Sequence, residues 1–174
     1  RSWGLQQSCG DFRQGDLCVF AKRPDSGGTT FLASESTYMA EQLPDDRTVL
    51  WINNEEQGDK VRRRVVQAEL GWTNAELDAN PTGAIQEYAA RIGSVEKIQV
   101  FDRAKVHTKD VEALCKSLKP GLIIFDQLHK VKGFESEAEH ERQTLLFNWS
   151  RELAKEYAPV IAVRQRGGGA GSVK

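Results

Sequence analysis

Short apolar runs alternate with longer amphipathic stretches along this chain. The apolar runs hold five or six residues each and are typical of buried parallel strands; they lie at 17–21, 48–53, 97–101, 121–126 and 159–163. Helical spacing of apolar positions predicts helices over 29–43, 58–70, 74–78 with 84–92, 108–118 and 136–157. This alternation predicts an α/β fold with a mainly parallel, twisted sheet and helices on both faces.

The segment between the first strand and the first helix has the pattern of a phosphate-binding loop. Residues 21–30 read Ala-Lys-Arg-Pro-Asp-Ser-Gly-Gly-Thr-Thr, a polar turn directly before a helix. Backbone N–H groups at a helix N-terminus can approach phosphate oxygens closely, so the pattern indicates a P-loop. Its usual lysine is replaced by Gly28, and Lys22 stands at the pattern's first glycine. Lys22 either reaches into the site from the start of the loop or is a solvated surface residue, and we favour the solvated residue because it starts from a different backbone position. The predicted nucleotide-binding residues are Arg23, Pro24, Asp25, Ser26, Gly27, Gly28, Thr29 and Thr30.

Carboxylates follow two other predicted strands, and ligands of such sheets bind beyond the carboxyl ends of the strands. Asp126 closes the apolar run 122–125, which is the Walker B pattern that places a carboxylate beside a nucleotide-bound Mg²⁺. The alternative is a core strand followed by a turn-forming aspartate. Glu55 and Glu56 follow the second strand, either as solvated charges or as the group that orients or deprotonates the attacking water. We favour Glu55 for that role, with Glu56 second.

Composition is that of one ordinary globular domain. The 174 residues suit a single α/β unit, and the formal net charge of -1 means that any polyanion must be bound by local clusters. Cys9, Cys18 and Cys115 are odd in number and widely spaced, which favours a reducing, cytoplasmic location over a disulfide framework. No membrane-length apolar run or signal pattern is found, so we expect a protein that is neither secreted nor membrane-inserted.

Four segments carry a combination of motifs that is more specific than a P-loop alone. They are the loop at 21–30, Leu-Trp-Ile-Asn-Asn-Glu-Glu at 50–56, Leu-Ile-Ile-Phe-Asp-Gln-Leu at 122–128 and Pro-Val-Ile-Ala-Val-Arg-Gln at 159–165. Together they resemble the RecA-fold ATPase core of DnaB-type replicative helicases, particularly phage-type relatives. The resemblance implies a RecA-like P-loop NTPase core over 1–166, a flexible Gly-rich tail over 167–174, and ATP and Mg²⁺ as ligands.

The resemblance also implies roles for individual residues. Thr29 and Asp126 would be the Mg²⁺ partners, Glu55 the catalytic carboxylate, and Gln165 the sensor that couples the γ-phosphate to the DNA-binding loop. In the resembling family, the segments after strands four and five face the channel of a hexameric ring that holds single-stranded DNA. The corresponding basic residues here are Lys130, Lys132, Arg164 and Arg166, with Phe134 as a base-stacking group. The alternative is that these are ordinary solubility residues.

Two departures from the family pattern keep other functions open. Gly28 removes a positive partner of the transferring phosphoryl group, so Gly28→Lys is expected to raise ATP turnover. The alternatives are a regulatory or structural subunit that binds nucleotide without hydrolysing it, and a RecA-like recombinase. The family core continues into strands that carry an arginine finger, whereas this sequence closes on the stretch 167–174. We therefore expect the finger to be missing and the family-type homo-hexamer to be weakened to a monomer or weak oligomer.

Overall fold

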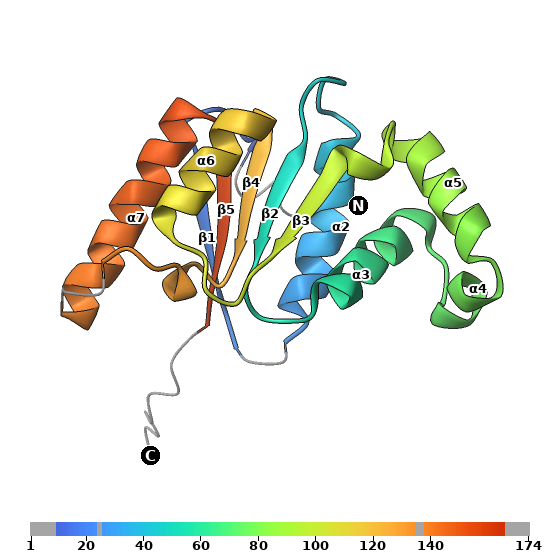
Figure 1. Ribbon diagram of the computed structural model, residues 1–174, viewed down its shortest axis with the longest axis horizontal. Helices are drawn as coiled ribbons and strands as arrows, with labels where there is room; N and C mark the ends of the chain where they lie inside the picture. The colour runs from blue at the N-terminus through green and yellow to red at the C-terminus, as the bar shows by residue number, and fades with distance from the viewer. Residues whose placement is uncertain (1–9, 24–25, 135–137, 166–174) are drawn as a thin grey trace, which may run out of the picture.

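The computed structural model describes residues 10–23, 26–134 and 138–165 and shows one parallel five-stranded sheet (Figure 1). Its strand order is β1-β5-β4-β2-β3, and every neighbouring pair is parallel. The strands are β1 (Leu17–Lys22), β2 (Val49–Asn53), β3 (Ile98–Asp102), β4 (Leu122–Asp126) and β5 (Val160–Gln165). All five predicted strands are confirmed, because β-branched, apolar runs of this length suit strands that are covered on both faces.

Helices cover both faces of the sheet, as the sequence predicted (Figure 1). One layer contains α2 (Gly28–Ala40), α3 (Gly58–Leu70), α4 (Asn74–Ala79) and α5 (Pro81–Ile92). The other layer contains α6 (Thr108–Leu118) and α7 (Glu139–Glu156). Two short 3₁₀ turns complete the described elements: η1 (Val95–Lys97) precedes β3, and η2 (Leu128–Lys130) follows β4. The start of the helix predicted over 136–157 lies partly outside the described residues.

Helix α5 begins three residues earlier than predicted. Asn80 accepts a hydrogen bond from the backbone of Gly83 at 3.0 Å, and Pro81 occupies the first helical position. Proline is well suited to that position because its fixed φ matches the helix and its missing N–H is not needed there. The Asn-Pro pair therefore starts a helix here, although the sequence pattern treated it as a connection.

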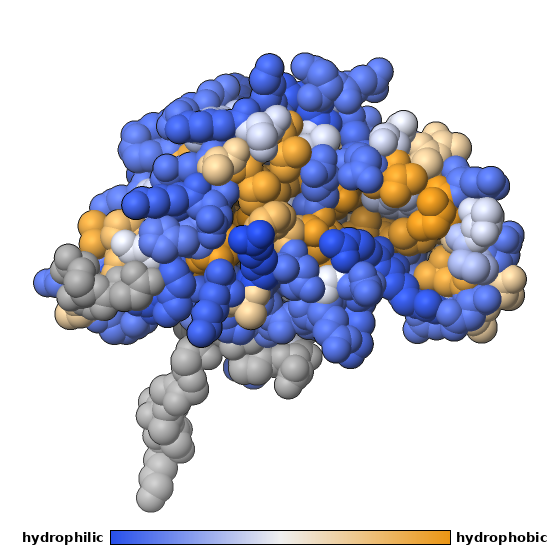
Figure 2. All heavy atoms as spheres, viewed as in Figure 1, coloured by the Kyte–Doolittle hydropathy of each residue, from blue (hydrophilic) through white to orange (hydrophobic). Residues whose placement is uncertain are grey.

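Of the three inner strands, β2 and β4 are buried along their whole length, so that all ten of their residues belong to the interior. Their side chains alternate between the layers. Trp51 and Ile124 pack among α2, α3 and α5, whereas Leu50, Ile123 and Phe125 pack against α6 and α7. The sheet edge at β3 is less covered: Figure 2 shows apolar surface in a hollow between α5 and α6, a groove of about 500 Å³.

Two further findings concern the chain as a whole. Cys18 and Cys115 do not form a disulfide with each other, and burial raises the pKa of the Cys115 thiol to about 12. Cys9 lies outside the described residues. No described helix combines the length and the apolar character that crossing a bilayer requires.

Asp102, the last residue of β3, fixes the loop that follows β2. Its carboxylate accepts hydrogen bonds from the backbone N–H of Gly58 at 2.7 Å and from Asn53 Nδ2 at 2.9 Å. Asn53 Nδ2 also donates to the carbonyl of Glu56 at 2.7 Å. A Cβ at Gly58 would lie 2.7 Å from Asp102 Cβ, so the helix start and the carboxylate meet closely only with glycine there. The loop carrying Glu55 is therefore anchored at both ends.

We predict that Asp102→Ala lowers the free energy of unfolding by about 1–3 kcal/mol, because two donors lose a charged acceptor. Urea denaturation measures this. The matched control is Asp59→Ala one residue into α3, whose side chain is 98% exposed and whose loss is expected to stay within about 0.5 kcal/mol. Equal losses in the two variants would contradict the anchoring role of Asp102.

Candidate nucleotide-binding site

Polar side chains from three strands meet at the start of α2. Asp126 ends β4 and Thr29 lies in the first turn of α2, and Thr29 Oγ1 donates to Asp126 Oδ2 at 3.1 Å. Both residues are buried. Parallel pairing places Asn53 of β2 directly beside Asp126, so the loop that carries Glu55 leaves the sheet at the same edge. The structure thus brings together the three residues that the sequence assigned to metal binding and water activation.

Lys22 joins this cluster, so the expectation that it is a solvated surface residue is wrong. Its side chain is only 12% exposed, and its Nζ lies 3.3 Å from Glu55 Oε2 and 3.9 Å from Asp126 Oδ1. Lys22 is the last residue of β1, and its side chain crosses the start of α2 over Gly28. The sequence carried a signal for this position, because lysine and glycine have exchanged places between the two ends of the loop.

Glu55 and Glu56, which the sequence could not separate, have different surroundings. Glu55 faces Lys22, and its side chain is 22% exposed. Glu56 forms an ion pair with Arg64 of α3. That pair ties Glu56 to α3, although the Glu56 charge also contributes to raising the pKa of Asp126. Arg64 belongs to the basic run 60–64, and Arg62 and Arg63 in the same run also bond within the chain.

Several buried polar atoms at this edge have no hydrogen-bond partner among the described residues. They are Asn53 Oδ1, Asn54 Oδ1, Asp126 Oδ1 and Gln127 Oε1. Asn54 Nδ2 donates to the carbonyl of Gln127 at 3.1 Å, and Gln127 has a left-handed backbone with φ 83°. Unsatisfied buried groups and unusual backbone conformations concentrate at ligand sites. Sequence reasoning missed Gln127 because neither property can be seen in a pattern of residue types.

Burial controls the electrostatics of Asp126. Loss of solvent raises the pKa of its carboxyl group, and the Lys22 amine and the Thr29 hydroxyl oppose that rise while Glu55 adds to it. A raised pKa means that the ionised form is less favourable in the folded chain than in the unfolded chain. Ionising Asp126 therefore costs more free energy in the folded chain than in the unfolded chain.

The phosphate-loop residues are described at both ends of the loop. Pro24 and Asp25 lie outside the described residues. Ser26 Oγ donates to the carbonyl of Arg23 at 2.7 Å, and Gly27 caps α2 with a left-handed φ of 78° and no side-chain hydrogen bond. The first amides of a helix have no intrahelical acceptor and carry its positive dipole end. The amides of residues 28–30 are therefore suited to bind an anion.

The basic residues predicted to contact DNA surround the loop after β4. Lys132 is exposed, and its backbone bonds to Val106 and Thr108. Lys130 is partly exposed, and Arg164 is exposed one residue before the end of β5. Burial lowers the pKa of His129, and the positive charges of Lys130, Arg142 and Arg164 lower it further. Arg166 lies outside the described residues.

Two other predicted residues are placed only in part. Gln165 pairs in register with Lys22, so its backbone ends β5 beside the cluster. Phe134 packs partly buried against the core between the sheet and α7, so it is less available for base stacking than predicted.

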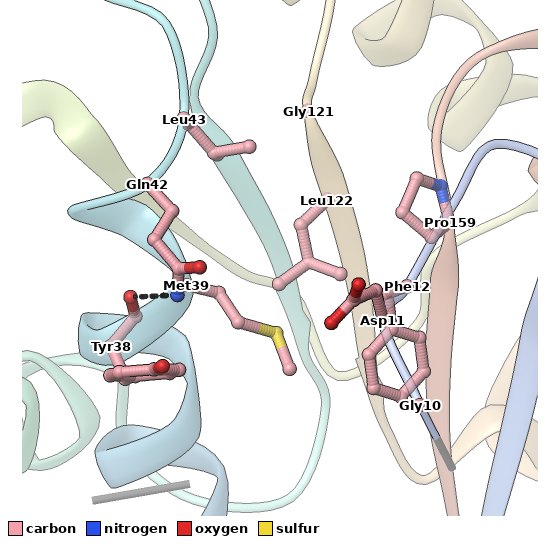
Figure 3. A pocket seen from close by; sticks show the side chains of 10 residues that line it. All are labelled: Gly10, Asp11, Phe12, Tyr38, Met39, Gln42, Leu43, Gly121, Leu122 and Pro159. Carbon is pink, nitrogen blue, oxygen red and sulfur yellow. Dashed lines mark hydrogen bonds between the residues drawn. The ribbon is translucent and has the colours of Figure 1, made fainter. Parts of the chain in front are cut away.

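A separate pocket lies at the opposite end of the sheet and does not include any of these residues. Figure 3 shows its lining, which comes from the end of α2, from the starts of β4 and β5, and from residues 10–12. Gln42 Nε2 donates to the carbonyl of Tyr38 at 2.9 Å at its rim. Its volume is about 290 Å³. Its place at the amino ends of the strands separates it from the phosphate loop.

Comparison with known proteins gives concordant matches. The family model described as DnaB-like helicase C terminal domain matches residues 3–167. Proteins named replicative DNA helicase DnaB from Geobacillus stearothermophilus and Mycoplasma genitalium are 22% and 25% identical to the chain. Each alignment covers 92% of this chain and 37% of the relative, so the chain spans little more than a third of these relatives.

A solved structure shares the fold. It is described as a DnaB-like replicative helicase and its interactions with primase, and it aligns with a TM-score of 0.78 at 17% identity. The alignment covers 95% of this chain and 42% of that chain. The parallel sheet with helices on both faces is therefore the RecA-like fold that the motifs predicted.

We predict that Asp126→Asn raises the melting temperature of the nucleotide-free protein by about 2–4 °C, because the neutral amide removes the penalty of a buried charge. The raised pKa means that the wild-type carboxyl group favours the fold at low pH and loses this contribution as pH rises through its folded pKa. The gain is therefore expected near neutral pH and should shrink in acid. Thermal unfolding at both pH values measures it, with the exposed Asp46→Asn as control; a lower melting temperature for Asp126→Asn at neutral pH would contradict the prediction.

Proposed function

The chain belongs to the DnaB-like helicase C-terminal domain family, and from this membership we propose that it is a helicase-type motor domain that binds and hydrolyses ATP in response to single-stranded DNA. One observation carries the proposal: Thr29, Asp126 and Glu55 converge at the helix start that a phosphate loop requires. The proposed ligands are ATP and Mg²⁺. Residues 1–166 are proposed to form a single RecA-like core.

The residues at the start of α2 fit a hydrated Mg²⁺ ion. Thr29 Oγ1 and Asp126 Oδ2 are adjacent oxygens, and Asp126 Oδ1 has no hydrogen-bond partner among the described residues. Mg²⁺ prefers such hard oxygen ligands and keeps several waters. When bound with ATP, the metal would neutralise charge on the β- and γ-phosphate oxygens. Thr29 and Asp126 would hold it, and Asp126 would then keep its ionised form despite burial.

The remaining groups are proposed to act on the phosphates and the water. The backbone amides of 28–30 would bind phosphate oxygens, and the exposed Arg23 and Ser26 line the entrance to this region. Glu55 would accept a proton from the attacking water or orient it. Gln165, beside Lys22 at the end of β5, would transmit the state of the γ-phosphate to the basic residues near it.

We predict that Glu55→Gln leaves ATP binding largely unchanged and lowers turnover by about 10²- to 10⁴-fold, because the amide cannot accept the proton. The matched control is Glu56→Gln, which loses an ion pair with Arg64 outside the cluster. Phosphate release measures turnover and calorimetry with Mg²⁺–ATP measures binding. A large loss of turnover in Glu56→Gln with little loss in Glu55→Gln would reverse the assignment.

Single-stranded DNA is the proposed polymer ligand. Lys130, Lys132 and Arg164 lie at the same edge of the sheet as the nucleotide cluster, so a change at the γ-phosphate has a short route to them. Arg166 is included in the proposal from sequence alone. Any family-type homo-hexamer is proposed only in the weakened form that the sequence predicts, and a location in the cytoplasm of a bacterial or phage-infected cell is proposed on family grounds.

We predict that Lys132→Ala weakens binding to single-stranded DNA and reduces the slope of log affinity against log salt concentration by about 0.7, the effect of one lost phosphate contact. Fluorescence anisotropy with a labelled oligonucleotide at several salt concentrations measures this. Lys116→Ala, an exposed lysine in the last turn of α6, removes the same charge at the other end of the sheet. Identical slopes for Lys132→Ala and the wild type would exclude a phosphate contact by Lys132.

A further inference from the structure

We infer that Lys22 supplies the amine that the phosphate loop lacks at position 28, so that the lysine of the nucleotide site comes from the end of β1 instead of the start of α2. In this role its Nζ would contact the β- and γ-phosphate oxygens of ATP. The inference rests on the proposed function, because it concerns the same site. It adds a residue that the P-loop pattern does not assign.

The first argument is steric. A Cβ at position 28 would lie 2.3 Å from Lys22 Cδ, 2.9 Å from its Cε and 2.7 Å from its Nζ. Heavy atoms that are not bonded do not approach so closely, so the Lys22 side chain occupies the space where any side chain at position 28 would begin. The absence of a side chain at Gly28 therefore leaves the space that the Lys22 side chain occupies.

The second argument is electrostatic. The Lys22 amine faces Glu55 and Asp126, the two carboxylates of the proposed site, and its side chain is 12% exposed. A solvated lysine gains entropy and hydration by extending into water. Lys22 instead lies where the metal, the phosphates and the attacking water are proposed to meet. ATP binding would require only a local movement of the amine from carboxylate to phosphate oxygen.

The third argument comes from the loop sequence. Gly-x-x-x-x-Gly-Lys-[Ser/Thr] has its glycine at position 22 and its lysine at position 28, and this chain has the reverse. Glycine at position 28 without Lys22 would leave the phosphates without an amine, and lysine at both positions would crowd the loop. The two changes compensate for each other in space. The alternative of a subunit that binds nucleotide but cannot hydrolyse it therefore loses its main support, which was Gly28.

The inference reverses the sequence-based expectation for Gly28→Lys. With Lys22 in place, a new side chain at position 28 would displace the flexible end of Lys22 from Glu55 and Asp126, so the single substitution is expected to lower nucleotide affinity and turnover. The benefit of a lysine at position 28 should appear only when Lys22 is removed as well.

The test is a set of variants of the whole chain, measured for Mg²⁺–ATP affinity by calorimetry and for turnover with single-stranded DNA. Lys22→Ala and Lys22→Met are expected to bind ATP at least about tenfold more weakly and to lose about 10²- to 10³-fold in turnover. Lys22→Met retains an apolar stem, so it separates loss of the amine from loss of packing. Lys22→Ala combined with Gly28→Lys should recover most of both quantities. Lys116→Ala controls for loss of a surface charge, and circular dichroism checks folding.

The outcomes separate this inference from the proposed function. Wild-type protein that binds ATP while both Lys22 variants bind it equally well would overturn the inference and leave the proposed function standing. Failure of the double variant to recover affinity, with Gly28→Lys alone improving it, would also overturn the inference. Wild-type protein without ATP affinity would overturn the proposed function and the inference together.

Discussion

Parallel pairing of the inner strands is the constraint on which the site depends. The register of β2 with β4 sets Asn53 beside Asp126, and that of β1 with β5 sets Lys22 beside Gln165. Because all the strands run in one direction, their carboxyl ends share one edge, and the side chains that follow them are brought together without a dedicated scaffold. Asp102 extends this arrangement to β3 by holding the start of α3 and the loop that carries Glu55.

Unfavourable features, namely a buried charge and a polar atom without a hydrogen bond among the described residues, occur at this same edge. Asp126 is buried with a raised pKa, and Gln127 combines a left-handed backbone with an amide oxygen that has no hydrogen-bond partner in the described part of the chain. Such features oppose folding unless the surrounding structure enforces them. Here the buried strands β2 and β4 supply that enforcement, so the groups proposed to bind phosphate, metal and water are held in position without a ligand.

Much of the fold could be predicted from the sequence because strand and helix periodicities are local. The ranges of α3 and α6 agree with the prediction, and all five strands were found with shifts of one or two residues. Thr29 and Asp126 could be proposed together as Mg²⁺ partners because the resemblance of their two motifs to the helicase family implies both roles. Lys22 was misjudged because its role depends on the space over Gly28, which becomes visible only when both ends of the loop are placed. The choice between Glu55 and Glu56 likewise depends on Arg64, because the ion pair that Arg64 forms with Glu56 becomes visible only when α3 is placed against the loop.

Competition for space between a side chain at position 28 and the far end of the Lys22 side chain also bears on how such a loop can arise and be recognised. Starting from the common P-loop arrangement, one substitution gives either two crowded lysines or none, so the exchanged pair has to pass through an unfavourable intermediate. Once established, the pair is hard to reverse one residue at a time, and lineages that carry it should carry both residues. A search that requires a lysine immediately before the threonine of the loop would overlook these proteins, whereas one that accepts either end of the loop would find them.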